Sequence, residues 1–464
     1  MSFVFYDTET TGISTDFDQI LQFGAIRTDA DLNEIDRVEM RCRLLPHVVP
    51  RPGALKVTGM SIARITDGAL PCHYEMIRTI REKLLDWSPS IFIGYNSMNF
   101  DEHLLRQALF RTLHPPYLTN TGGNGRADAM TLIQAATQFA PGCIEVPLNP
   151  KGKPVFKLDR LAPANGFAHD SAHDALADVE ATIHLAKRVR ERAPECWQRF
   201  VSFSSKAGVA RFMASQPAFV LTEFYYNKPF HFVVGALGPD PDNPAVQLCL
   251  HLRHDLDAIA GLSEADMAEW MAKSPKPIRK LKTNAGPSIA PMSAASHSML
   301  GDLTPAAAQA AAQRLQVDAA LRQRLIRVAT SAREAFPESP HVEEQLYSAY
   351  IPDRDTQRMN AFHAAPWNDR VSIVDALEDR RLRYYGYRLV YERHPEMLRH
   401  EIRAFFATHD RERLMDATGT AKWGTLHAAL EEIAEARADC SGDVLNMLAE
   451  YEVYLRDRIA SYSD

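Results

Sequence analysis

The sequence has no apolar run long enough to span a bilayer, and it has few cysteines. A membrane-spanning helix needs about 20 consecutive apolar residues, and no such stretch occurs among the 464 residues. The six cysteines are scattered and form no C-x-x-C pair, which is typical of buried thiols in a reducing compartment. The N-terminus lacks a basic segment followed by an apolar one, so we expect a cytoplasmic protein without a secretory signal or a membrane partner.

Positive charge is also scarce. Lysine and arginine number 52 against 59 aspartate and glutamate residues, which gives a net charge of −7. This balance argues weakly against a nucleic-acid partner, although basic residues concentrated in one groove would outweigh it. A chain of 464 residues is too long for a single core, so we expect roughly two or three domains.

Strand-like and helix-like segments alternate over about the first 193 residues. Residues 3–7 and 19–29 have the apolar pattern of strands. Residues 73–87 and 173–193 instead carry apolar side chains at helical spacing. Strands followed by helices in this order are typical of an α/β domain.

The rest of the chain differs from the first 193 residues in its pattern of apolar and polar residues. The segment from about 195 to 335 reads as two aromatic-rich strands around a turn at 227–229, followed by short strands and a long helical extension. We interpret the basic run at 273–282 as a strip that contacts phosphates rather than a solvated loop. Of the aromatic residues 224–226, we expect at least half to pack in the core, with the others open for stacking. Beyond 336, nearly every segment has helical periodicity.

The first strand ends in two carboxylates, in the segment FVFYDTETTG. Residues two apart on a strand share a face, so Asp7 and Glu9 point the same way. Alone, this pair would equally fit an acidic turn after a strand. Two further acids change the interpretation, because Asp101 follows another strand-like run at the start of a helix and Asp178 lies in a later helix.

A histidine accompanies the last of these acids. His173 precedes Asp178 by five residues, a spacing that does not share one helix face. The two side chains converge only if His173 lies before the helix or in its first turn, and Asp174 as the N-cap would place it there. Alone, His173 would be read as a structural histidine.

Four carboxylates that meet at one spot repel each other unless a cation lies between them. Oxygen ligands suit hard divalent ions such as Mg²⁺ or Mn²⁺. Two such ions about 3.5–4 Å apart stabilise the attacking and the leaving oxygen of a phosphodiester displacement. A neutral imidazole nearby can take the proton of the attacking water, since the reference pKa of histidine is about 6.5.

Three motifs carry a resemblance to a known superfamily. YDTET, GYNSMNFD and HDALAD occur in this order and resemble the exonuclease motifs of the DEDDh (DnaQ-like) 3′→5′ exonucleases. The resemblance implies that four acids bind metal ions and that His173 acts as the general base. The implied metal ligands, for two Mg²⁺ ions that Mn²⁺ can replace, are Asp7, Glu9, Asp101 and Asp178.

Longer stretches, among them PGALKVTGM, FKLDRLAPANGFAHDSAHDALADVEAT and EEQLYSAYIPDRD, resemble the bacterial exonuclease I family over nearly the whole chain. The resemblance implies an RNase H-like (DnaQ-like) exonuclease domain with a mixed sheet at 1–193. An SH3-like DNA-binding β domain with a long helical extension follows at 195–335, and an all-α C-terminal domain at 336–464. The three domains would form a C-shaped clamp around the DNA.

The same resemblance implies a monomeric 3′→5′ exonuclease that degrades single-stranded DNA to 5′-mononucleotides in DNA repair and recombination. It also implies contact with the acidic C-terminal tail of single-stranded-DNA-binding protein. Two alternatives stay open. One is an exoribonuclease of the same superfamily that trims RNA, and the other is a non-catalytic clamp that only binds single-stranded nucleic acid.

Five residues are candidate substrate contacts. The resemblance implies that Glu9 also contacts the terminal 3′-hydroxyl and that Lys157 binds a phosphate where the family usually has arginine. It places Arg106 at a DNA-contact position, against the alternative of a helix-surface arginine. Tyr95 and Phe100 flank the second motif and could stack on the terminal base, although core packing is the first expectation for Phe100.

Overall fold

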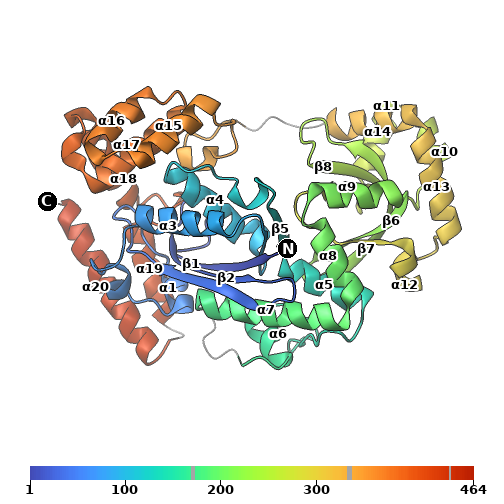
Figure 1. The fold of residues 1–464 in the computed structure, drawn as a ribbon, viewed down its shortest axis with the longest axis horizontal. Helices are drawn as coiled ribbons and strands as arrows, with labels where there is room; N and C mark the ends of the chain where they lie inside the picture. Colours follow the sequence, from blue (N-terminus) through green and yellow to red (C-terminus); the bar gives the residue numbers. More distant parts are fainter. Residues whose placement is uncertain (169–172, 332–336, 438–439, 464) are drawn as a thin grey trace.

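The computed structural model describes residues 1–168, 173–331, 337–437 and 440–463. Figure 1 shows a first α/β region, a second β region on one side of it, and a set of C-terminal helices on the other. None of the helices in these described ranges is both long and apolar enough to cross a membrane. The six cysteines are free thiols, as expected.

The first region is built on a five-stranded sheet in the order β3-β2-β1-β4-β5. β1 pairs antiparallel with β2 and parallel with β4, so the sheet is mixed, as predicted. Its strands are β1 (Phe3–Thr10), β2 (Ile20–Thr28), β3 (Glu34–Arg41), β4 (Ile91–Gly94) and β5 (Gly125–Asp128). β1 runs through the centre, but its pairing with β4 ends at Phe5, so its C-terminal end pairs with β2 alone.

Helices cover both faces of this sheet (Figure 1). The α-helices of the region are α1 (Pro52–Thr58), α2 (Ile62–Ile65), α3 (His73–Asp86), α4 (Asp101–Arg111), α5 (Ala129–Phe139), α6 (Leu158–Ala164), α7 (Ala175–Arg192) and α8 (Pro194–Phe203). The next helix, α9 (Lys206–Ser215), packs on the second region, where its Val209 shares a core with Phe219. Short 3₁₀ turns are η1 (Ser97–Asn99) and η2 (Leu118–Asn120). Because side chains alternate along β1, Val4 and Tyr6 pack against α3 and α4, while Phe3 and Phe5 pack in the core that contains α5, α7 and α8.

The second region is a five-stranded sheet in the order β10-β6-β7-β8-β9, and every pairing in it is antiparallel. The strands are β6 (Ala218–Tyr225), β7 (Lys228–Pro239), β8 (Val246–His251), β9 (Ile278–Lys282) and β10 (Ile289–Pro291). The helices are α10 (Leu256–Gly261), α11 (Glu264–Ala272), α12 (His297–Leu300), α13 (Pro305–Val317) and α14 (Ala319–Ser331), with the turn η3 (Met292–Ala294).

The turn between β6 and β7 was predicted one residue too late. Tyr225 pairs with Lys228, so Tyr226 and Asn227 form the turn and Pro229 already belongs to β7. Both turn residues have positive φ, 52° for Tyr226 and 63° for Asn227. Turns of this mirror-image type match the right-handed twist of the flanking strands, which explains why the tight turn is preferred over a longer one.

The C-terminal part is helical, as its periodicity predicts. It contains α15 (Asp353–Ala364), α16 (Trp367–Ala376), α17 (Arg380–Arg393), α18 (His400–Leu414), α19 (Leu426–Ala436) and α20 (Asp443–Ser463), with the turns η4 (Val342–Gln345) and η5 (Pro395–Met397). These helices pack on the first region at two places: α19 and α20 share a core with α1 and α2, and α15–α17 share one with α3 and α4.

The domain boundaries at 193–195 and 335–336 stay predictions. Residues 332–336 lie outside the described part of the chain. Near 193, α8 follows α7 directly, and its Trp197 and Phe200 pack in the same core as Phe3. The apolar core of the first region therefore extends past residue 193.

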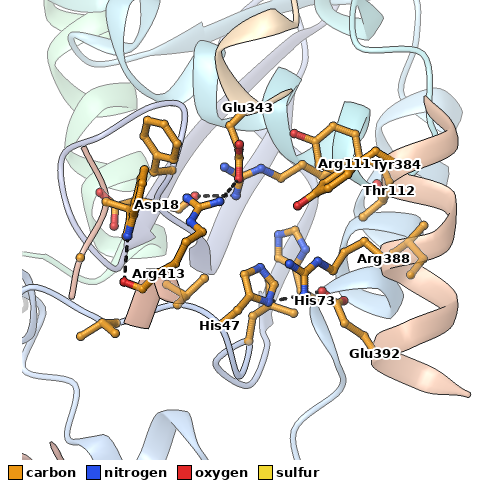
Figure 2. Close-up of a pocket in the computed structure, with 18 residues that line it drawn as sticks. Asp18, His47, His73, Arg111, Thr112, Glu343, Tyr384, Arg388, Glu392 and Arg413 are labelled. Atoms are coloured by element: carbon orange, nitrogen blue, oxygen red, sulfur yellow. Dashed lines mark hydrogen bonds and ion pairs between the residues drawn. The ribbon is translucent and has the colours of Figure 1, made fainter. Parts of the chain in front are cut away.

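A buried polar cavity of about 40 Å³ lies between the first region and the C-terminal helices (Figure 2). Arg413 and Glu343 form an ion pair there, with Nη1 and Oε1 2.5 Å apart. The Arg413 guanidinium also lies over the Trp423 ring, 4.1 Å from its centre. Burial alone would raise the pKa of Glu343, but Arg413 and Arg111 hold that pKa below its ordinary value.

Arg413→Ala is expected to lower the free energy of unfolding by about 3–5 kcal/mol, because it leaves the Glu343 carboxylate buried without its partner. The neighbouring pair Lys422–Glu344 is the matched control, since the Lys422 side chain is 54% exposed. Lys422→Ala should cost at most about 1 kcal/mol. Urea unfolding measures both variants, and equal losses would contradict the assignment of Arg413–Glu343 as the ion pair that stabilises this contact.

Candidate active site

The end of β1 places two acids on one face of the sheet. Asp7 pairs with Gly24 of β2, and Glu9 pairs with Gln22. Gly24 lets the start of α7 approach β2, because a Cβ at this position would lie 2.8 Å from backbone atoms of Ala175 and Leu176. The missing side chain thus brings the first turn of α7 next to the two acids.

The predicted N-cap is confirmed. The Asp174 carboxylate accepts a hydrogen bond from the backbone N–H of Ala177 and caps α7. Asp174 is also anchored to the sheet, because its Oδ2 accepts hydrogen bonds from Gln22 and Arg41 at 3.0 and 2.7 Å. His173 therefore lies just before the helix, as expected, and its φ of 67° turns the chain there.

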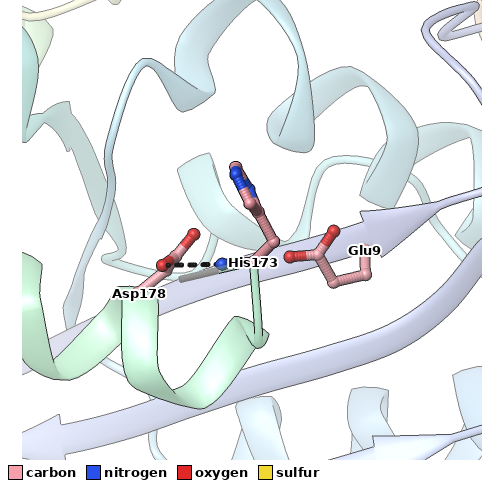
Figure 3. Close-up of side chains that lie close together, drawn as sticks. All are labelled: Glu9, His173 and Asp178. Carbon is pink, nitrogen blue, oxygen red and sulfur yellow. Dashed lines mark hydrogen bonds between the residues drawn. The ribbon is translucent and has the colours of Figure 1, made fainter. Parts of the chain in front are cut away.

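These elements bring three of the five predicted residues into one cluster, which Figure 3 shows. The ligand atoms of Glu9, His173 and Asp178 all lie within 4.8 Å of one another. The backbone N–H of His173 also donates to Asp178 Oδ1 at 3.4 Å. Within the described residues, this is the group whose spacing suits a bound metal ion.

Asp101 lies buried at the start of α4, next to the same strand end. The Thr8 hydroxyl donates to Asp101 Oδ1 at 2.5 Å, so Thr8 orients this carboxylate from the opposite face of β1. In the sequence, Thr8 is simply the residue between Asp7 and Glu9. No local pattern links it to a residue 93 positions away.

The buried carboxylates at the end of β1 would be stabilised by a bound cation. Burial and the charges of Asp101, Asp178 and Glu9 raise the pKa of Asp7 well above its ordinary value. Burial, with Asp178 and Asp101, raises the pKa of Glu9 to about 9. Burial also raises the pKa of Asp101 to about 7, although the Thr8 hydrogen bond opposes the shift. Such a donor set of carboxylate oxygens fits hard divalent ions.

Two of the predicted substrate contacts line a pocket with the cluster. Tyr95 and Lys157 share a pocket of about 580 Å³ with His173 and Asp178. Lys157 is exposed, and Tyr95 is held in the wall because its hydroxyl donates to the Phe156 carbonyl at 2.5 Å. Their roles on a substrate stay predictions that this placement supports.

The other two lie elsewhere. Phe100 packs against the core formed with α3 and α4, in line with the first expectation for this residue. Arg106 is not on the helix surface: its side chain is 8% exposed and pairs with Glu102 at 2.7 Å. Its guanidinium also donates to Asn120 and lies over the Tyr117 ring. The interior partners favour a structural role, so a DNA contact by Arg106 stays a prediction without structural support.

The basic run is divided between two environments. Arg279 of β9 forms an ion pair with Glu223 and lies over the Phe232 ring at 4.1 Å. The remaining members are exposed: Lys273, Lys276, Lys280 and Lys282. Lys273 also pairs with Glu269, with Nζ and Oε1 4.0 Å apart. A role for this strip in binding DNA stays a prediction.

The mixed sheet, with carboxylates and a histidine gathered at the end of its central strand, defines the class as a DnaQ-like, RNase H-type exonuclease. The exonuclease (RNase T) family model matches residues 4–186, and the exonuclease I C-terminal domain model matches residues 340–457. The chain therefore belongs to the bacterial exonuclease I family.

Individual relatives agree with this assignment. The chain is 26% identical to exodeoxyribonuclease I of Haemophilus influenzae over 82% of this chain and 84% of that protein. It is 34% identical to exodeoxyribonuclease I of Buchnera aphidicola from Schizaphis graminum, over 46% of this chain but 44% of the relative. The crystal structure of Escherichia coli exonuclease I in complex with a dA16 oligonucleotide superposes with a TM-score of 0.84, at 22% identity and over 98% and 99% of the two chains. The expected fold class is thereby confirmed.

Proposed function

We propose that the protein is a Mg²⁺-dependent 3′→5′ exonuclease that hydrolyses single-stranded DNA to 5′-mononucleotides, in repair and recombination. The observation that carries the proposal is the Glu9–His173–Asp178 cluster, which opens into the pocket that also holds Lys157. The relatives are exodeoxyribonucleases, and the E. coli enzyme was crystallised with a DNA oligonucleotide. A cytoplasmic location is part of the proposal.

The residues divide the chemistry between them. Asp7, Glu9, Asp101 and Asp178 would hold two divalent ions, with Mn²⁺ able to replace Mg²⁺. Ions held by these residues would acidify a water and neutralise charge on the leaving oxygen. His173 takes the proton of the attacking water on a ring nitrogen and releases it to solvent. Its place before α7 leaves the imidazole exposed, so that the proton can leave.

The pocket wall positions the strand end. Lys157 offers a single positive charge to a phosphate, without the two-pronged contact that arginine makes. Tyr95 supplies an aromatic wall whose hydroxyl is already engaged with Phe156. Glu9 is expected to contact the terminal 3′-hydroxyl as well as metal.

One experiment tests the proposal against its alternatives. Labelled single-stranded DNA, duplex DNA and RNA are incubated with the protein, with and without Mg²⁺. We expect degradation from the 3′ end of single-stranded DNA only when Mg²⁺ is present. Preference for RNA would favour the exoribonuclease, against which the matched C-terminal domain argues. Binding without degradation would favour a non-catalytic clamp.

Two further measurements address oligomeric state and partner. Sedimentation of the same protein tests whether it is a monomer. Binding of a peptide from the acidic C-terminal tail of single-stranded-DNA-binding protein tests that protein as a partner.

Divalent ions are expected to stabilise the folded protein, because the carboxylates repel each other without them. A ligand that binds only the folded state at a hundred times its Kd adds about 2.7 kcal/mol to the free energy of unfolding. Thermal unfolding in EDTA and in Mg²⁺ or Mn²⁺ measures the gain as a higher Tm. The same Tm in all three conditions would contradict a metal site at these acids.

A further inference from the structure

A buried carboxylate lies outside the catalytic cluster, at the end of β5. Asp128 is 5% exposed, and it pairs with Gly94 of β4, the strand next to β1. A carboxylate is costly to bury unless hydrogen bonds satisfy its oxygens. The hydrogen-bond partners of Asp128 therefore indicate which segments this side chain holds together.

Backbone N–H groups from two segments donate to Asp128. Its Oδ1 accepts from Met130 at 2.9 Å and so caps the start of α5. The same oxygen accepts from Asn96 at 2.9 Å, and Oδ2 accepts from Met98 at 3.1 Å. Asn96 and Met98 belong to the turn between β4 and α4. One carboxylate thus caps a helix and holds this turn against β5.

The turn between β4 and α4 leads directly to a catalytic acid. Asn96 takes a left-handed conformation, with φ of 58°, and η1 then carries the chain to Asp101 at the start of α4. The chain folds back closely on β4, because a Cβ at Gly94 would lie 2.4 Å from the Ser97 side chain. Asn96 also lines the catalytic pocket. The backbone of this turn therefore sets where the Asp101 carboxylate lies.

We infer that Asp128 is a positioning residue for the metal site, because it holds the turn at 96–98 so that Asp101 lies where it can bind an ion. Asp128 acts through the backbone of the turn, not through contact with ion or substrate. Thr8 orients the same carboxylate through its side chain, so Asp101 is held from two sides. The inference rests on the proposed function and deepens it. Partners that orient a metal ligand change metal affinity or activity about 10–100-fold when they are removed.

Asp128→Asn keeps the shape of the side chain and removes the hydrogen bond to Met98. The amide oxygen can still accept from Asn96 and Met130, whereas the NH₂ group faces the Met98 N–H, donor against donor. We expect kcat on single-stranded DNA to fall about 10–100-fold. KM for DNA should stay near the wild-type value, because no DNA contact is lost. Thermal unfolding across a Mg²⁺ titration measures metal affinity without catalysis, and the rise in Tm should need about ten times more Mg²⁺.

Two further variants separate positioning from stability. Asp128→Ser keeps a capping oxygen for α5 but is too short to reach the turn, so kcat and Mg²⁺ affinity should fall further than in Asp128→Asn. Asp355→Asn is the matched control, since this buried carboxylate in α15 accepts from the backbone N–H groups of Glu378 and Asp379. It should lower the Tm as Asp128→Asn does but leave kcat and the Mg²⁺ response unchanged.

Failure of the positioning role and failure of the proposed function give different results. If wild type digests single strands and Asp128→Asn lowers only the Tm, as Asp355→Asn does, the positioning role is wrong and the proposed function stands. Should Asp128→Asn not fold, the same measurements on Asp128→Ser decide in the same way. If wild type digests no single-stranded DNA in Mg²⁺, the proposed function and the positioning role fall together.

Discussion

Asp7→Asn is expected to abolish nuclease activity while DNA binding remains measurable. Burial, together with the charges of Asp101, Asp178 and Glu9, raises the pKa of Asp7, so a bound cation is needed to favour its charged form. Metal ions contribute several kcal/mol of charge stabilisation to a phosphodiester transition state, and about 1.4 kcal/mol is a factor of ten in rate. We therefore expect a loss of about 10³-fold or more in kcat.

Measurements of thermal stability distinguish this loss of activity from misfolding of the variant. Asparagine has the same shape as aspartate but no charge, so Asp7→Asn removes part of the repulsion and should raise the Tm in EDTA. The gain in Tm on adding Mg²⁺ should shrink at the same time. Glu412→Gln, at an exposed position on α18, is the charge-matched control and should leave both quantities unchanged. Normal digestion of single strands by Asp7→Asn would show that the site is assigned wrongly.

His173→Ala is expected to reduce kcat by about 10²–10⁴-fold, the usual share of a general base. The structure brings His173 into the same cluster as Glu9 and Asp178, a placement compatible with either a base or a metal ligand. The two roles differ in a readout besides activity. A general base should leave the Mg²⁺-induced rise in Tm intact, whereas removal of a ligand should reduce it.

The control for this variant is His297→Ala, since His297 is exposed on α12. It should have the activity and the Tm of the wild type. Near-normal activity of His173→Ala at neutral pH would rule out the role as base. A lost Tm response to Mg²⁺ together with lost activity would reassign His173 as a ligand.

Local patterns predicted much of the fold because buried side chains recur at short, regular intervals along strands and helices. The apolar run in residues 3–7 predicted β1, and the helical spacing of apolar residues in 73–87 predicted α3. The N-cap at Asp174 was predictable because a cap depends on residues only a few positions apart. The position of the β6–β7 turn was missed because two left-handed residues, one of them tyrosine, are uncommon.

The sequence by itself determined the chemistry: Asp7, Glu9, Asp101, His173 and Asp178 occur in motifs whose order already indicates a phosphodiester-cleaving metal site. The tertiary structure alone decided which side chains are free to act on a substrate. Thr8 donates a hydrogen bond to Asp101, which is 93 positions away in the sequence, and Arg106 pairs with the buried Glu102. Asn227 at the tip of the β6–β7 hairpin donates a hydrogen bond to Pro154, 73 positions away. Such contacts depend on how distant elements pack, which no spacing within a segment can report.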